Sequence, residues 1–487
     1  MELIFDILKK LKNYEIRHIR YLLKASPFEF EKVGKLFDLV TRYKDREESW
    51  YSNSIYGKKP GNTFRVTKSR LKKILEEVVI SDKSLTDYNT GHINALLKSR
   101  KRLLQGQILL GRGAYSASKN LLLQVVGDSR KFSLHPEHFQ SELLLLRGES
   151  INMTIREFQR RSAKLLELNE IQSLVNESAI LHYSVTNLMT HRTVSDEKTM
   201  SEISANVSRI REIALHTSSP VALYYQLLTD ILWWQYQFEF DKALQSCRQY
   251  IELLRVEPAV QSQQRLGNAN FQMSEISLRM GDLDQASQYM QEALSSFSPD
   301  ETNYLIVLGT AFRIAFYRSD YDTAATIVKE SLAHPRLGAS KMRSATWNYF
   351  QASLLFRMGK FKEALKSLNN ATALLSDKLG WNIGFRLLEI MIMFESGHYD
   401  LLDARILNMR QYVRRTHKDS ELYRPMQLIS ILMEWHKNSL DLRRGANAIS
   451  RKIRNLETFH RNIPFNPTSF ELVRFEEWMK GKVGNRN

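Results

Sequence analysis

Arginine and tyrosine side chains recur ahead of successive turns in the second half of this 487-residue chain. They are Arg279, Arg313, Tyr317, Tyr349 and Arg357. A guanidinium binds a carboxylate through two parallel hydrogen bonds, and an aromatic ring offers a face to cations and apolar groups. On one shared surface, these side chains would bind an acidic peptide or a C-terminal carboxylate. A structural alternative stays open, in which Arg279 and Arg357 satisfy the last carbonyl groups of their helices.

Patterns that carry reaction chemistry do not occur in the sequence. It has no His-Glu-x-x-His, no Gly-x-x-x-x-Gly-Lys, no Gly-x-Ser-x-Gly and no Gly-x-Gly-x-x-Gly. His135 and His138 come nearest to a metal cluster, but Pro136 breaks the helical register and no further ligand follows. We therefore expect no enzyme, no cofactor and no metal ion.

The elements that must position the arginines and tyrosines are repeats. Leu278–Ala286 (Leu-Arg-Met-Gly-Asp-Leu-Asp-Gln-Ala) returns as Phe356–Ala364 (Phe-Arg-Met-Gly-Lys-Phe-Lys-Glu-Ala). The small residues of successive turns lie 38, 40 and 38 positions apart: Gly281, Ser319, Gly359 and Gly397. Self-similarity at this period predicts a solenoid in which each helix hairpin buries its apolar face against the next. The expected fold class is all-α.

This pattern resembles the tetratricopeptide repeat family, whose unit of about 34 residues contains a Gly-x-aromatic-x-x-Ala turn. The resemblance covers residues 84–436 and is clearest over 262–400, while residues 132–220 are expected to be divergent repeats. It implies that the small residues at the turns are packing positions: Gly281, Ala286, Ala324, Gly359 and Ala364. The repeats are longer here than in the family, so groove positions can be displaced. The chain also resembles bacterial repeat proteins that begin with a helical module.

In this family the inner face of the solenoid binds peptides, and the resemblance implies such a groove here. Counting back from each turn places eight side chains on that face: Asn268, Glu275, Arg279, Arg313, Tyr317, Tyr349, Ser353 and Arg357. The expected function is a non-catalytic scaffold or adaptor whose partner is a protein or peptide. The arginines favour an acidic segment. Self-association stays open.

The net charge of +17 is distributed unevenly. Residues 1–131 carry 27 Lys and Arg against 14 Asp and Glu, residues 132–330 carry 17 against 25, and residues 331–487 carry 26 against 14. The alternative function is therefore a regulatory or nucleic-acid-associated protein, whose basic ends contact phosphate while the repeats sense a partner or peptide. The basic runs match no nucleic-acid-binding module, and a solvated charged surface explains them more simply.

Three regions are expected along the chain. Residues 1–83 form a basic helical module, residues 84–436 form the hairpin array, and residues 437–487 form capping helices and a tail, with a closing helix over Ser469–Met479. The single cysteine is Cys247, and the sequence shows no signal peptide and no apolar run as long as a membrane span. These features favour a cytoplasmic, reducing location.

Overall fold

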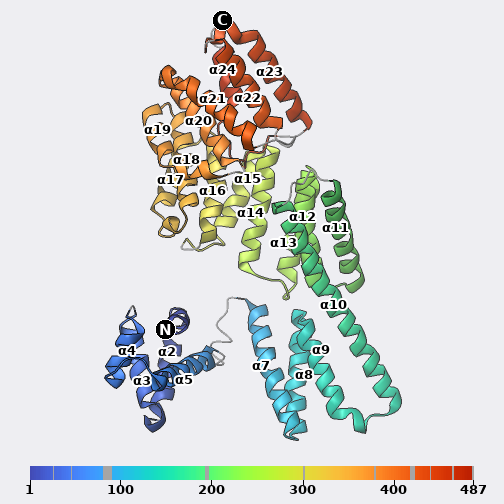
Figure 1. Ribbon diagram of the computed structural model, residues 1–487. Coiled ribbons are helices and arrows are strands. Elements are labelled where there is room, and N and C mark those ends of the chain that lie inside the picture. Colours follow the sequence, from blue (N-terminus) through green and yellow to red (C-terminus); the bar gives the residue numbers. More distant parts are fainter. Residues whose placement is uncertain are drawn as a thin grey trace. The chain divides into compact units, whose positions relative to one another are not determined.

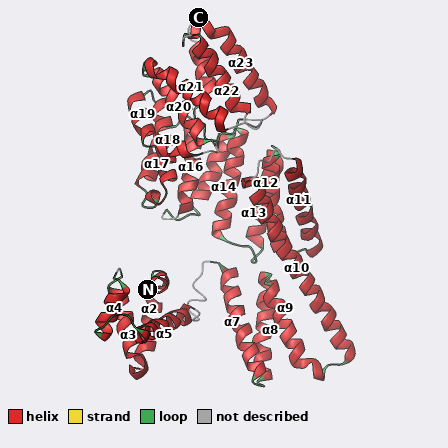
Figure 2. Cartoon of the chain, viewed as in Figure 1, coloured by secondary structure: helices red, strands yellow, loops and turns green. Residues whose placement is uncertain are grey.

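The computed structural model describes all residues except 26, 45, 80–89, 192–196, 300–301, 378–379, 417–422, 439, 463–464 and 485–487. Every regular element among the described residues is a helix, with no strand (Figure 2). The expected all-α fold is confirmed, since helices pack against their neighbours in chain order, as in a helical-repeat solenoid. The chain divides into two compact units, Met1–Ser173 with Glu257–Gln261, and Leu174–Val256 with Ser262–Asn487.

The N-terminal module has a core of its own. Its helices are α1 (Glu2–Leu8), α2 (Asn13–Ala25), α3 (Pro27–Arg42), α4 (Glu48–Tyr56) and α5 (Asn62–Val79) (Figure 1). Ile19, Leu36 and Leu71 are fully enclosed where α2, α3 and α5 meet. The module is helical, and its described residues show no hairpin repeat. The boundary expected between residues 83 and 84 lies outside the described residues.

Helix hairpins begin after residue 90. The next elements are α7 (Gly91–Gly111), α8 (Tyr115–Phe132), α9 (His135–Glu149), the short 3-10 helix η1 (Ser150–Asn152) and α10 (Ile155–His191). Ser118 on α8 donates a 2.7 Å hydrogen bond to the carbonyl of Gly106 on α7. Helix α10 is 37 residues long, and its residues from Leu174 onward belong to the second unit. Helices of such unequal length fill the region expected to hold divergent repeats.

The second unit continues as a series of hairpins (Figure 1). After α11 (Glu197–Thr217), the pairs are α12 (Pro220–Tyr236) and α13 (Phe240–Val256), α14 (Gln263–Met280) and α15 (Leu283–Leu294), α16 (Thr302–Tyr317) and α17 (Tyr321–Ala333), α18 (Lys341–Arg357) and α19 (Phe361–Asn369), α20 (Trp381–Glu395) and α21 (Tyr399–Thr416), and α22 (Tyr423–Lys437) and α23 (Leu442–Asn462). The 3-10 helices η2 (Leu337–Ala339) and η3 (Thr372–Ser376) lie in connections.

The last helix is shorter than the sequence suggested. Helix α24 spans Phe475–Gly484, and the residues from Ser469 to Arg474 are irregular. The closing helix expected from Ser469 therefore begins only at Phe475. The boundary between the hairpin array and the capping helices is expected between residues 436 and 437, a position that falls in the last turn of α22. This boundary stays a prediction.

Six hairpin turns share one backbone conformation. A residue one or two positions after the end of each first helix has a positive φ: Gly113 (77°), Phe238 (59°), Gly281 (83°), Ser319 (60°), Gly359 (73°) and Gly397 (77°). The next amide then bonds a carbonyl one turn back, as Lys360 N–H does to the Leu355 carbonyl at 2.9 Å. This is the left-handed cap that ends many helices. The turn residues that recur along the sequence therefore mark a backbone motif.

The small residues at the turns have two separate roles. Ala286, Ala324 and Ala364 are completely buried. Gly281 and Gly359 are exposed, and a Cβ at either would meet no atom within 4 Å. The expectation that these glycines are packing residues is therefore corrected. They supply a positive φ, which a residue with a Cβ adopts only at a cost.

Ser319 occupies the same left-handed position without the freedom of glycine. We expect Ser319→Gly to stabilise the protein by about 0.5–1 kcal/mol, because relief of the Cβ strain outweighs the added flexibility of the unfolded chain. Thermal unfolding measures the change. Gly359→Ser is the reciprocal control and should lower the melting temperature. A lower melting temperature for Ser319→Gly would show that the turn is not strained.

Candidate functional site

The first helices of successive hairpins form one surface, here named the first-helix face (α12, α14, α16, α18 and α20). Helix α14 contacts α16, and α18 contacts α20. Thr310 on α16 donates a 3.2 Å hydrogen bond to Glu275 on α14, and Arg279 donates a 3.3 Å hydrogen bond to Gln235 on α12. Residues chosen from the sequence thus interact between neighbouring hairpins on this face.

Three arginines of this face stack over aromatic rings of adjacent hairpins. The guanidinium carbon lies 4.7 Å from the ring centre for Arg279 over Phe240, 4.8 Å for Arg313 over Phe350 and 5.9 Å for Arg357 over Phe316. Such cation–π contacts contribute about 0.5–2 kcal/mol, more where the pair is shielded from water. The arginines therefore join consecutive hairpins in addition to any role in binding.

Burial separates the eight expected groove residues. Asn268 and Arg357 are exposed. Glu275, Arg279 and Tyr317 are partly buried. Arg313, Tyr349 and Ser353 are 9%, 1% and 0% exposed. Ser353 donates a 2.9 Å hydrogen bond to the Tyr349 carbonyl of its own helix. Tyr349 and Ser353 are therefore closed to an external ligand in this structure.

An irregular segment of the same chain covers the buried residues. We name Phe465–Arg474, between α23 and α24, the C-terminal strap. Arg313 Nη2 donates to the Ser469 carbonyl at 3.4 Å, and the Tyr317 hydroxyl donates to the Pro467 carbonyl at 3.4 Å. The backbone of Leu472 hydrogen-bonds Tyr349. The part of the expected peptide groove on α16 and α18 is thus occupied by the protein itself.

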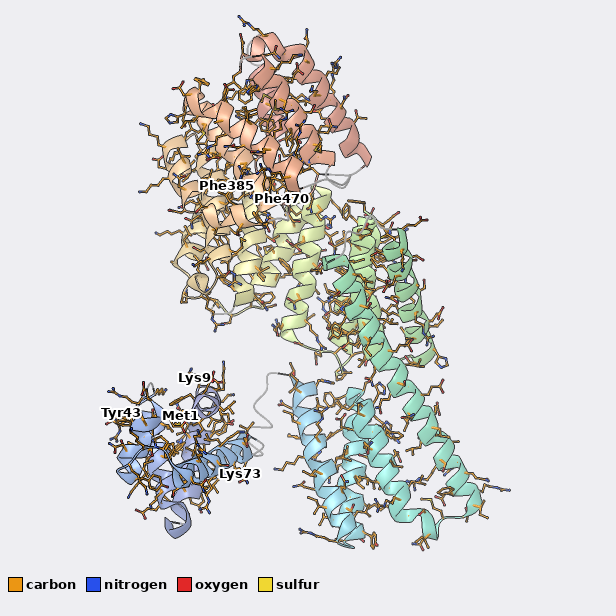
Figure 3. The ribbon with its side chains drawn as sticks, in the orientation of Figure 1. Met1, Lys9, Tyr43, Lys73, Phe385 and Phe470 are labelled. Atoms are coloured by element: carbon orange, nitrogen blue, oxygen red, sulfur yellow. The ribbon has the colours of Figure 1, made fainter. Side chains whose placement is uncertain are left out.

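Two glycines of the α20 segment make room for the strap. Phe470 lies against Gly380 and Gly384, and Figure 3 labels it beside Phe385. A Cβ on Gly384 would collide with the Phe470 carbonyl, and a Cβ on Gly380 would collide with the Phe470 ring. Helix α20 is buried along nearly its whole length. That burial follows from the strap and α24, which cover a first helix that would otherwise face solvent.

A buried ion network anchors the end of the strap. Arg424 on α22 donates to both carboxylate oxygens of Glu471 at 2.9 and 2.7 Å, and to both of Glu476 at 3.0 and 2.7 Å. The carboxylate side chains are 3% and 1% exposed. Burial opposes ionisation of Glu476, but hydrogen bonds and charge from Arg424 outweigh it and lower the pKa of that carboxyl. Both acids therefore share the Arg424 guanidinium, and Glu476 also accepts a 2.9 Å hydrogen bond from Arg474.

Burial also perturbs the charged groups of the first-helix face. It raises the pKa of Glu275, against the opposing charges of Arg313 and Arg279. It lowers the pKa of Arg313, whose Nε has no hydrogen-bond partner among the described residues. Its guanidinium donates to two backbone carbonyls, that of Gly309 at 3.5 Å and that of Ser469 at 3.4 Å. Arg313 is therefore incompletely satisfied, which is costly for a buried cation.

Beyond the strap, the first-helix face is open. A cavity of about 420 Å³, here named the open groove, lies among α10, α12, α14 and α16. Its lining includes Arg265, Asn268, Phe271, Gln272 and Ile306. The Arg265 guanidinium carbon lies 4.5 Å from the centre of the Tyr224 ring. Of the eight residues chosen from the sequence, Asn268 alone lines this groove.

Sequence reasoning missed Arg424, Glu471 and Gly384. Glu471 stands in a segment whose pattern suggested a helix, and Arg424 precedes it by 47 positions. No local spacing links the two. The one available signal was Pro467, which disfavours a helix at the residue before it.

Neither a membrane span nor a metal site is found in the part of the chain that the structure describes. No helix there is long and apolar enough to cross a bilayer, and no three His, Cys, Asp or Glu side chains form a group able to hold a metal ion. The likeness to tetratricopeptide repeats rests on the turn frame, because the chain matches no protein-family model and no curated protein.

Proposed function

We propose that this protein is a non-catalytic scaffold or adaptor that binds a protein or peptide segment in the open groove. The observation that carries the proposal is the combination of side chains in that cavity of about 420 Å³. Asn268 and Gln272 offer amides that can pair with a peptide backbone. Ile306, which is 54% exposed, and Phe271 offer apolar surface for its side chains. A peptide needs both kinds of contact.

The charge of the open groove favours an acidic segment. Arg265 supplies a guanidinium, and the described residues that line the groove include no Asp or Glu. A carboxylate on the partner would therefore meet a complementary charge.

The repeat family and the location belong to the same proposal. The shared left-handed turns support repeats of the tetratricopeptide type. A cytoplasmic location is supported by Cys247, the single cysteine, which is buried. Burial raises the pKa of its thiol to about 12, so the thiol is unreactive.

The alternative function, in which the basic ends contact phosphate, has less support than peptide binding. Four basic side chains near the N-terminus already pair with acids: Lys68 with Glu48 at 2.8 Å, Lys72 with Glu76 at 3.4 Å, Arg100 with Glu137 at 2.8 Å and Arg102 with Asp128 at 2.7 Å. Cations that are already neutralised contribute less to counterion release on nucleic acid. Retention on heparin or DNA that falls steeply with added salt would reverse this preference.

We expect Ile306→Glu to weaken partner binding about tenfold or more, because loss of one buried aliphatic contact alone costs about 1.5–3 kcal/mol. The added carboxylate would also repel an acidic segment. Proteins retained from native extract are identified by mass spectrometry, and the affinity of the retained partner is then measured by calorimetry.

The matched control for this test is Leu401→Glu. Leu401 is 56% exposed and lies on α21, a second helix away from the groove. Leu401→Glu should leave the affinity for the retained partner unchanged. Equal binding by the wild type and Ile306→Glu would place the partner site outside the open groove.

A further inference from the structure

The two halves of the C-terminal strap are held differently. The inner strap, Glu471–Arg474, contains three buried residues, including Leu472 at 0% and Val473 at 2% exposure. The outer strap, Phe465–Phe470, touches the first-helix face through two carbonyls at 3.4 Å and the Phe470 ring, and its Phe465 ring stacks on the guanidinium groups of Arg424 and Arg474 at 5.2 and 4.8 Å. Hydrogen bonds of 3.4 Å are longer than the usual 2.7–3.2 Å and correspondingly weak. The outer strap is therefore the weaker half.

The inner strap has anchors of its own, in addition to the stacking of Arg424 and Arg474 on Phe465 of the outer strap. Glu471 keeps its two hydrogen bonds from Arg424 and accepts a third from the Phe475 amide at 2.9 Å, at the start of α24. Helix α24 is also tied to α20, where Trp478 donates to Glu395 at 2.6 Å. Displacement of the outer strap would leave these contacts in place.

The covered surface is built to receive an extended main chain. Arg313 and Tyr317 present donors to carbonyl groups, and Gly384 leaves room where the Phe470 backbone crosses α20. The outer strap satisfies Arg313 only in part, since Nε lacks a hydrogen-bond partner among the described residues and the Ser469 carbonyl lies 3.4 Å from Nη2.

We propose that the outer strap is a displaceable internal ligand, which pivots at Glu471 and uncovers a second peptide site on α16, α18 and α20. The site takes an extended segment that carries an aromatic residue, in the position the outer strap occupies. Its opening extends the open groove along the first-helix face, so the inference rests on the proposed function. The strap then sets partner affinity, because a covered site binds only in the fraction of molecules that are open.

A peptide of residues 461–470, amidated and fluorescently labelled, tests the site directly. We expect it to bind Phe470→Ala about tenfold or more tightly than it binds the wild type, because the variant weakens the competing internal segment. Adding Gly384→Ala to Phe470→Ala should abolish binding, since the new methyl group collides with the crossing backbone. Gly309→Ala is the matched control on α16. Its Cβ would meet Phe350 at 3.7 Å and Arg313 Nη1 at 3.9 Å, both ordinary contacts, and peptide binding should persist.

Hydrogen exchange of the wild type and Tyr317→Phe gives a second readout that requires no peptide. The amides of the outer strap should exchange at least about tenfold faster than those of Leu472 and Val473. Tyr317→Phe keeps the ring but loses the bond to Pro467, and should speed exchange of the outer strap alone.

Equal peptide affinity in Phe470→Ala and the wild type, binding that survives Gly384→Ala, or one exchange rate along the whole strap would each overturn the proposal. Ile306→Glu acts in the open groove and should leave peptide binding unchanged. Failure of the strap proposal is thereby distinguishable from failure of the proposed function.

Discussion

Arg424→Ala is expected to lower the free energy of unfolding by about 3–5 kcal/mol, the typical result of removing one partner from a buried ion pair. The variant leaves Glu471 and Glu476, 3% and 1% exposed, without the guanidinium that bonds both. Arg474 still donates to Glu476 at 2.9 Å, which limits the loss for that carboxylate. Chemical denaturation at pH 7 measures the change.

The loss of unfolding free energy caused by Arg424→Ala should become smaller at acidic pH. Interactions in the folded protein lower the pKa of Glu476 below its ordinary value of 4.5, so this group stabilises the fold above that pH. The contribution disappears as the pH falls through the folded pKa. Removal of Arg424 takes away the main cause of the lowered pKa. The stability curves of the wild type and Arg424→Ala should therefore converge below about pH 4.5.

An exposed pair of similar geometry provides the control. Arg209 donates to both oxygens of Glu177 at 2.8 and 3.1 Å, but these side chains are 44% and 38% exposed. Arg209→Ala should cost no more than about 1 kcal/mol, because solvent screens the pair. If Arg424→Ala cost no more than Arg209→Ala, the buried network would not hold the inner strap in place.

Ala364→Phe is expected to destabilise the solenoid by about 1–3 kcal/mol, because the added ring has no space in a packed core. Ala364 is 0% exposed and belongs to the core formed by α16 to α24. Its helix, α19, packs directly against α18. Thermal unfolding followed by circular dichroism measures the effect.

The control for Ala364→Phe lies on the same helix. Lys362 is exposed, and Lys362→Phe should change stability by less than about 0.5 kcal/mol. An unchanged melting curve for Ala364→Phe would contradict the hairpin register. A large loss for Lys362→Phe would instead point to a general intolerance of aromatic residues on α19.

The C-terminal strap divides the first-helix face into a covered part and an open part. Arg313 and Tyr317 are satisfied in part by carbonyls of the strap, while Asn268 borders an open cavity. The eight residues chosen from the sequence therefore divide between a covered site and an open one. A partner that binds only the open groove would not require Arg313, whereas a partner that displaces the outer strap would.

The sequence by itself determined the repeat fold, because its signals are local. The spacing of Gly281, Ser319 and Gly359 marks left-handed caps, which are set by φ at one residue and a hydrogen bond within one turn. Ala286 and Ala364 follow each cap at a fixed distance on the second helix, so their burial follows from helical periodicity. Each cap and its alanine lie fewer than ten residues apart, and the caps recur at a period of 38–40 positions, so both signals can be found in a single sequence.

The tertiary structure alone decided which part of the first-helix face is open. Arg313 meets Ser469 across 156 positions, Tyr317 meets Pro467 across 150, and Arg424 meets Glu471 across 47. No local period encodes such pairs, because they form only when the stacked hairpins bring α16, α22 and the strap together. Gly384 illustrates the reason: its missing side chain matters only because the Phe470 backbone crosses it.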